Sequence, residues 1–170
     1  MKIAVLSDSH DHIWNLKKAL ALLKKEKCEA IVFCGDMCAP FTARILMDAK
    51  IKTYVVWGNN DEDHWAIVQN AGENFIAYPL AQEFGEEEID GRKIAFCHYP
   101  MLGQLLAATG HYDAVFHGHT HRQYKKMVGK TLLTNPGAVC GIVGGKPGLA
   151  SFAVYDTSDN SSKLVEISRA

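Results

Sequence analysis

The stretch Lys2-Ile3-Ala4-Val5-Leu6-Ser7-Asp8-Ser9-His10-Asp11-His12 decides how the rest of the chain is interpreted. It opens with the apolar run Lys2–Leu6, which is typical of a fully buried strand. Polar residues end that run abruptly, and apolar residues then recur at helical spacing from Ile13 to Leu23 with lysines between them. We predict that Asp11 caps this helix. The stretch therefore predicts a buried strand, a polar turn and an amphipathic helix.

The same pattern of strand and helix occurs twice more in the next 50 or so residues. Further strands are predicted at Ala30–Cys34 and Thr53–Trp57. A helix that begins at Pro40 and ends near Ala49 follows the first of them, and a helix ending near Ala71 follows the second. Three such alternations predict βαβ units and a sheet whose central strands are parallel.

The second half of the chain has a different pattern, which is mainly antiparallel. Asp90-Gly91 separates the strand-like runs Glu83–Ile89 and Lys93–Cys97, a strong signal for a hairpin. Further strand-like runs are Ala114–Phe116, Gln123–Val128, Thr131–Thr134, Leu149–Tyr155 and Lys163–Ile167. Because no linker or repeat interrupts the 170 residues, we predict a single α/β domain over residues 1–170.

Composition excludes several classes of protein. The chain is 48% apolar and 22% charged, with 18 Lys and Arg against 19 Asp and Glu, so its formal charge is −1. This balance excludes wholesale disorder and argues against a dedicated nucleic-acid surface. No apolar run approaches the ~20 residues of a membrane span, and the first residues do not resemble a signal peptide. We therefore expect no membrane association. Five cysteines without a CxxC pair do not form a disulfide framework, so we expect a reducing cytoplasm.

Five of the predicted apolar strands end in residues that can bind a metal ion. In chain order these residues are Asp8 and His10, then Asp36, then Asn59, then His98, and then His117, His119 and His121. The carboxyl ends of strands are where ligand sites form in open α/β sheets. Carboxylate and amide oxygens with imidazole nitrogens suit Mn, Fe, Ni or Zn. Each residue alone is explained by a turn, a cap or a hydrogen bond, but the combination predicts a metal site.

The order of these motifs resembles a known family. The motifs are Asp8-Ser9-His10, Gly35-Asp36, Gly58-Asn59-Asn60-Asp61, His98 and Gly118-His119-Thr120-His121, and Asn135-Pro136-Gly137 resembles a further loop. Together they resemble the calcineurin-like metallophosphoesterases, and most of all their small prokaryotic phosphodiesterase branch. The resemblance implies a four-layer αββα sandwich, in which two mixed sheets are flanked by helices.

The resemblance also implies a site for two divalent metal ions, with manganese as the first choice and nickel, iron or zinc as alternatives. One ion would be bound by Asp8, His10 and His121, the other by Asn59, His98 and His119, with Asp36 as the bridge between them. The implied reaction is hydrolysis of a small phosphate ester, a diester rather than a monoester, by in-line attack of a hydroxide between the metals. Catalytic roles would fall on Asp36, Asn59, His98 and Asn60.

Three positions depart from the family pattern or lie outside it. Asn60 stands where many members have a histidine, and an amide cannot act as a general acid. Asp61 is retained without an imidazole to orient, and Tyr99 stands where glycine is usual, which would narrow the site. His117 precedes the last motif, and strand pleating predicts that it lies on the same face as His119 and His121.

Two other functions remain open at this point. One branch of the family, a subunit of the eukaryotic retromer coat, serves in assembly, so this chain is alternatively a weakly active or inactive interaction scaffold. All seven ligand positions are filled by metal-competent side chains, which favours an enzyme. A redox or metal-storage role fits the oxygen-rich ligand set poorly. Trp14 and Trp65 are either core residues or contacts of a homo-oligomer.

Overall fold

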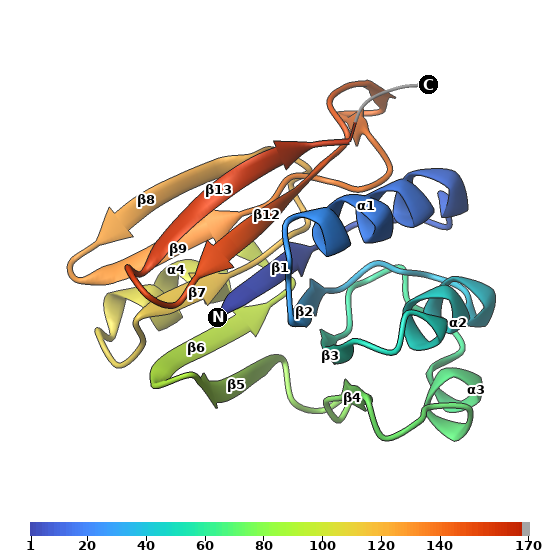
Figure 1. The fold of residues 1–170 in the computed structure, drawn as a ribbon, viewed down its shortest axis with the longest axis horizontal. Coiled ribbons are helices and arrows are strands. Elements are labelled where there is room, and N and C mark those ends of the chain that lie inside the picture. The colour runs from blue at the N-terminus through green and yellow to red at the C-terminus, as the bar shows by residue number, and fades with distance from the viewer. Residues whose placement is uncertain (168–170) are drawn as a thin grey trace.

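Residues 1–167 are described by a computed structural model, in which two sheets pack face to face between helices (Figure 1). The first sheet contains β1 (Lys2–Leu6), β2 (Ala30–Cys34), β3 (Lys52–Val56), β4 (Phe75–Ala77), β12 (Ser151–Asp156) and β13 (Ser161–Glu166). The second contains β5 (Phe84–Ile89), β6 (Arg92–Cys97), β7 (Ala114–Phe116), β8 (Tyr124–Val128) and β9 (Thr131–Asn135). The helices are α1 (Ile13–Lys25), α2 (Pro40–Asp48), α3 (His64–Gln69) and α4 (Pro100–Ala108). A small ladder joins β10 (Ile142–Val143) and β11 (Lys146–Pro147).

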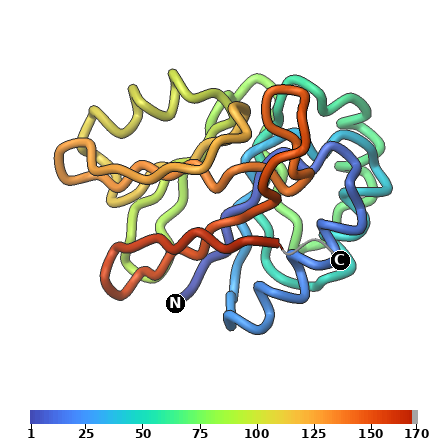
Figure 2. The backbone as a smooth tube through the Cα atoms, turned by 90° about the horizontal axis from the view of Figure 1, so that it is seen from above, coloured from blue at the N-terminus to red at the C-terminus, as the bar shows by residue number. Residues whose placement is uncertain are grey.

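Both sheets are mixed, as the resemblance implies. The first has the order β13-β12-β1-β2-β3-β4, in which β1 to β4 are parallel and the C-terminal hairpin β12–β13 is antiparallel to β1. Figure 2 shows that red hairpin beside the blue N-terminal strand. The second has the order β5-β6-β7-β9-β8, with β6, β7 and β9 parallel and an antiparallel strand at each edge. Each of the five strands that precede the candidate ligands is therefore parallel to at least one neighbour in its own sheet.

The alternation of side chains along β1 explains the four layers. Ile3 and Val5 point into the core between the two sheets, whereas Ala4 and Leu6 point into the core under α1, α2 and α3. On the far side, α4 covers the second sheet through Leu106 and other buried residues. Because β1 is apolar on both faces, it is buried by both layers. The predicted αββα sandwich is confirmed.

The loop after β1 differs from its prediction in one detail. His12, and not Asp11, is the N-cap of α1, and its Nδ1 accepts a hydrogen bond from the amide of Asn15 at 3.2 Å. The Asp11 carboxylate accepts hydrogen bonds from the amide of Ala39 at 3.0 Å and from the hydroxyl of Thr42 at 2.5 Å. The capping prediction for Asp11 is wrong, because its side chain joins the loop after β1 to the start of α2.

The structure confirms one predicted hairpin, adds elements that were not predicted, and decides where two tryptophans lie. The hairpin at Asp90-Gly91 is confirmed, since Ile89 pairs with Arg92 across a two-residue turn. The strand β4, the helix α4 and the β10–β11 ladder were not predicted. Trp14 and Trp65 are 67% and 71% exposed, so the alternative that they are core residues is wrong. Among the described residues, no helix is both long and apolar enough to cross a membrane.

Candidate metal centre

The loops at the carboxyl ends of β1, β2, β3, β6 and β7 meet at one place between the two sheets. The loops after β1 and β2 are joined by hydrogen bonds from the amide of Asp8 to the carbonyl of Gly35 and from the amide of His10 to the carbonyl of Asp36, at 3.0 and 3.1 Å. Several of these residues have a left-handed backbone, including Asp36 at φ 60°. Non-glycine residues in this region are strained, and such strain collects at functional sites.

Two glycines allow the loops to approach each other. A Cβ at Gly118 would lie 1.8 Å from the hydroxyl of Ser7, and a Cβ at Gly58 would lie 2.1 Å from the carboxylate of Asp36. Gly118 follows β7 in the second sheet, whereas Ser7 follows β1 in the first. A side chain at Gly118 would therefore separate the two halves of the site.

Asp36 lies at the centre of the assembled residues. Its side chain is buried, and its Oδ2 is 3.5 Å from Nε2 of both His10 and His98. Asn60 donates two hydrogen bonds to the same carboxylate, one from its backbone N–H and one from its side-chain Nδ2, each at 2.8 Å. His10 follows a strand of the first sheet and His98 follows a strand of the second. A carboxylate that lies between their imidazoles has the geometry that a bridging ligand requires.

A first cluster contains Asp8, His10 and His121, whose ligand atoms lie within 4.8 Å of one another. The Nε2 atoms of the two histidines are 3.1 Å apart, and Nε2 of His121 is 3.3 Å from Oδ1 of Asp8. This interaction with Asp8 raises the pKa of His121 to about 10. Oδ1 of Asp8 is fully buried and has no well-formed hydrogen bond among the described residues. A buried carboxylate oxygen without a hydrogen bond favours a cation beside it, which is either a protonated His121 or a metal ion.

A second cluster lies on the other side of Asp36. Nε2 of His98 is 3.1 Å from Oδ1 of Asn59 and 3.1 Å from Nδ1 of His119. Nδ1 of His98 faces the carbonyl of Cys34 at 2.8 Å and must donate to it, since a carbonyl only accepts. A neutral His98 therefore presents the lone pair of Nε2 to the site, the arrangement usual for metal-binding histidines. The structure brings all seven predicted ligands together.

His117 does not lie where strand pleating predicts. Its ring is fully buried, bonds to the hydroxyl of Tyr124, and packs against Gly103 of α4. Burial lowers the pKa of His117 to about 4. The prediction of a shared face is wrong because β7 ends at Phe116, and the next ligand, His119, already has a φ of 69°.

Two polar residues support the ligand loops. Asp61 accepts hydrogen bonds from the backbone amides of Asp36 at 2.9 Å, Gly58 at 2.7 Å and Cys38 at 2.8 Å, so it joins the loops after β2 and β3. Asn135 donates to the carbonyl of Gly118 at 2.9 Å and also contacts the hydroxyl of Thr120 at 3.0 Å. The sequence contains Asp61 and Asn135 within recognisable motifs, but these contacts are not encoded in any local pattern.

Tyr99 and the cysteines lie around the ligands without replacing any of them. The ring of Tyr99, which is 41% exposed, stands with its centre 5.1 Å from that of His98 and 5.2 Å from that of His119. Sγ of Cys38 is 3.8 Å from Nδ1 of His10, on the side of the ring opposite to the ligand atom Nε2. Burial raises the pKa of Cys38 to about 12, which keeps it a thiol.

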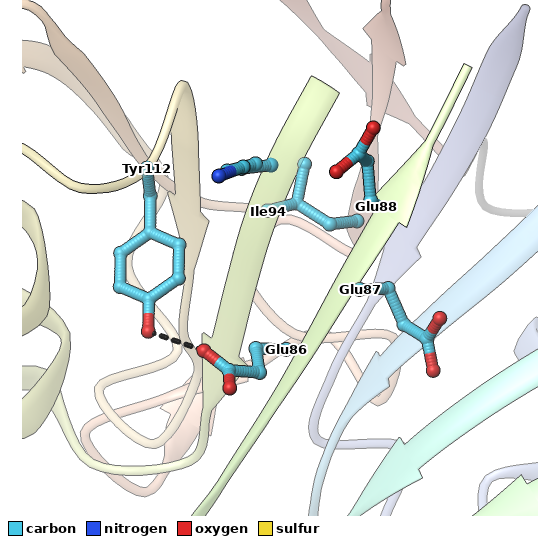
Figure 3. Close-up of a pocket in the computed structure, with 6 residues that line it drawn as sticks. Glu86, Glu87, Glu88, Ile94 and Tyr112 are labelled. Carbon is cyan, nitrogen blue, oxygen red and sulfur yellow. Dashed lines mark hydrogen bonds between the residues drawn. The ribbon is translucent and has the colours of Figure 1, made fainter. Parts of the chain in front are cut away.

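Another pocket, of about 290 Å³, lies on the β5–β6 hairpin, where Glu86 bonds to the hydroxyl of Tyr112 (Figure 3). Its Glu88 pairs with Lys93 near the start of β6, whereas His98 follows the end of that strand. None of the predicted ligands lines this pocket among the described residues. It is therefore separate from the site.

Comparison with known proteins agrees with the fold. Residues 1–160 match the family profile described as the calcineurin-like phosphoesterase superfamily domain. Phosphodiesterase MJ0936 of Methanocaldococcus jannaschii is 31% identical over 159 residues, which are 92% of this chain and 93% of that protein. The chain therefore belongs to the calcineurin-like phosphoesterase superfamily.

Solved structures show the same architecture. A structure described as a novel archaeal phosphodiesterase has a TM-score of 0.86 at 27% identity and covers 98% of this chain and 99% of its own. The phosphoesterase YfcE of E. coli has a TM-score of 0.69 at 18% identity, with 99% and 100% coverage. Vps29 of Entamoeba histolytica in complex with Zn²⁺ has a TM-score of 0.68, also at 18% identity, with the same coverage. The last two support the fold alone.

Proposed function

We propose that this protein is a phosphodiesterase that uses two divalent metal ions, with manganese as the preferred metal. Asp8, His10 and His121 would bind one ion, Asn59, His98 and His119 the other, and Asp36 would bridge them. The observation that carries the proposal is the position of the Asp36 carboxylate, 3.5 Å from an imidazole of each cluster. The buried Oδ1 of Asp8, which has no hydrogen bond among the described residues, also supports it.

When bound, two divalent ions in such a site activate a water for in-line attack and offset the charge that develops on the phosphoryl oxygens. The residues of this chain orient that chemistry. Asn60 holds Asp36 through two hydrogen bonds and presents no titratable group. His98 is fixed in one tautomer by the carbonyl of Cys34. The ring of Tyr99 lies beside those of His98 and His119, where it would narrow the approach to the site.

The second candidate is an interaction scaffold without strong catalysis. The likeness to Vps29 supports a shared fold and no more, at 18% identity. Against the scaffold stands the complete set of seven ligand residues, whose loops are supported by Asp61 and Asn135.

We also propose that the protein acts on a small phosphate ester in the cytoplasm. Light scattering of the purified protein tests a homo-oligomer, in which the exposed Trp14 and Trp65 are candidate contacts.

Metal analysis and activity together test the proposed function. Protein purified without chelator is expected to hold up to two divalent ions per chain, and to hydrolyse bis(p-nitrophenyl) phosphate faster than p-nitrophenyl phosphate. Activity is lost in EDTA and is restored best by manganese. Protein that contains two ions but hydrolyses no diester would favour the scaffold, and protein that binds no divalent ion would overturn the metal assignment.

A further inference from the structure

A pocket of about 300 Å³ opens beside the candidate metal centre. It is lined by His10, Asp11, Cys38, Ala39, Pro40, Asn60, Glu62 and Asp63. The pocket begins at one proposed metal ligand, His10, and at Asn60, which holds the bridging Asp36. A diester bound at the metals would therefore place one of its two ester substituents in or near this pocket. Its volume is at the lower end of the ~300–1,000 Å³ common for ligand sites, so it suits a small substituent.

The charges of this pocket have one sign. Asp11, Glu62 and Asp63 line it, and in the described part of the chain no lysine or arginine does. The carboxylates of Asp11 and Asp63 each accept hydrogen bonds from backbone amides, Ala39 and Ala66 respectively. Glu62 is exposed, and its carboxylate has no hydrogen bond or ion pair with another described residue. Of the three acids, Glu62 is thus the one whose carboxylate is not bonded to the protein.

The three acids that line this pocket are separate from the proposed metal ligands. Two bound metal ions would offset the charge of Asp36, but Asp11 and Glu62 lie outside the proposed ligand set. The pocket therefore remains negative next to a centre that attracts a phosphate anion.

From this arrangement we infer that the pocket binds a primary ammonium group on one ester substituent of the substrate, and that Glu62 determines this specificity. The inference rests on the proposed phosphodiesterase function and names its substrate class, an aminoalkyl phosphodiester. A phosphate monoanion at the metals and an ammonium at Glu62 complement the two opposite charges of the site. A primary ammonium donates hydrogen bonds to carboxylates, whereas quaternary ammonium groups are typically held by aromatic cages. No Phe, Tyr or Trp lines this pocket among the described residues.

Two isosteric substrates test the inference in the manganese-loaded protein. Both are p-nitrophenyl diesters, one with a 2-aminoethyl group and one with a propyl group, so leaving group and size are matched. We expect kcat/KM to be about 5-fold higher for the aminoethyl ester, since exposed ion pairs are each worth up to ~1 kcal/mol and the pocket holds three acids. Raising the salt concentration narrows the ratio because salt screens exposed charges.

Glu62→Gln supplies the matched variant. It keeps the size of the side chain and is expected to lower the aminoethyl-to-propyl ratio about 3-fold, with little change for the propyl ester. Glu88→Gln removes the same charge from the distant β5–β6 hairpin and should leave the ratio unchanged. Equal kcat/KM for the two esters, or equal effects of the two variants, would overturn the inference.

Calorimetry separates this inference from the proposed function. The product 2-aminoethyl phosphate should bind the manganese-loaded protein more tightly than propyl phosphate, and Glu62→Gln should remove most of the difference. If that preference is observed while no diester is hydrolysed, the pocket assignment is correct and the proposed function is wrong. If diesters are hydrolysed while the two products bind equally, the proposed function is correct and the pocket assignment is wrong.

Discussion

The candidate metal centre has two halves, one from the loops of each sheet, and they contribute different chemical groups. The loops after β1, β2 and β3 contribute both carboxylates, Asp8 and Asp36, which are almost completely buried. The loops after β6 and β7 contribute three imidazoles and no carboxylate, and one of these, His119, is exposed. In the proposed assignment each ion takes ligands from both halves. Neither sheet alone supplies all the proposed ligands of either ion, so the complete site exists only when the two sheets are packed together.

The first prediction contrasts one residue from each half. Asp36→Asn should lose both ions and reduce kcat/KM by about 10³-fold or more, because a neutral amide is a poor bridge and the metals contribute several kcal/mol. His119→Ala, in the other half, should lose one ion. The measurement is metal content by mass spectrometry alongside hydrolysis of bis(p-nitrophenyl) phosphate. Full metal content and normal turnover in Asp36→Asn would refute the bridging assignment.

The second prediction concerns the proton that the leaving group needs. Asn60, which lies in the half that contributes the carboxylates, cannot transfer it. A general acid contributes about 10²–10⁴-fold, so diesters with poor leaving groups should be hydrolysed slowly by this protein. The dependence of kcat/KM on leaving-group pKa should be steep. Asn60→His should flatten it while p-nitrophenyl esters change little.

One alternative for that proton is a water or another histidine, and the notable candidate, His117, is buried under α4 and bonded to Tyr124. An equally shallow dependence in the parent protein and in Asn60→His would show that an acid lies elsewhere. His117→Gln would then identify or exclude that residue, since a glutamine cannot transfer the proton.

The third prediction tests how the imidazole half is supported. Burial lowers the pKa of His117 from 6.5 to about 4, so the folded state disfavours its protonation. The resulting stability is present above pH 6.5 and is lost progressively as the pH falls through 4. Without metal, the difference in unfolding free energy between the parent and His117→Gln should shrink by about 3 kcal/mol over this window. Chemical denaturation at several pH values measures it, and parallel pH curves for the two proteins would contradict it.

The smallest effect is expected for the thiols beside the two halves. Sγ of Cys38 lies 3.8 Å from His10 and Sγ of Cys140 lies 3.9 Å from His121, each facing Nδ1 rather than Nε2. Cys38→Ala and Cys140→Ala should both keep two ions per chain and nearly the parent activity. Loss of one ion in either variant would make that thiol a ligand and would replace the assignment of its neighbour.

The sequence by itself determined most strands, most helices and the candidate metal ligands. Alternating burial along Lys2–Leu6 and polar residues at five strand ends are local patterns, because side-chain direction has a period of two in a strand. The turn at Asp90-Gly91 is equally local, since both residues accept a positive φ. The ligand candidates could therefore be named from the sequence, and the family resemblance could divide them between two ions.

Only the tertiary structure decided how those residues meet and what surrounds them. Asp11 binds α2 instead of capping α1, and His117 turns away from His119 because the chain leaves its strand after Phe116. The approach of Gly118 to Ser7 joins two sheets through residues 111 positions apart, and no local pattern encodes a contact at that separation. The negative pocket at Glu62 likewise forms from three separate loops. Long-range packing, which places such loops side by side, is the physical reason that these features could not be predicted from the sequence.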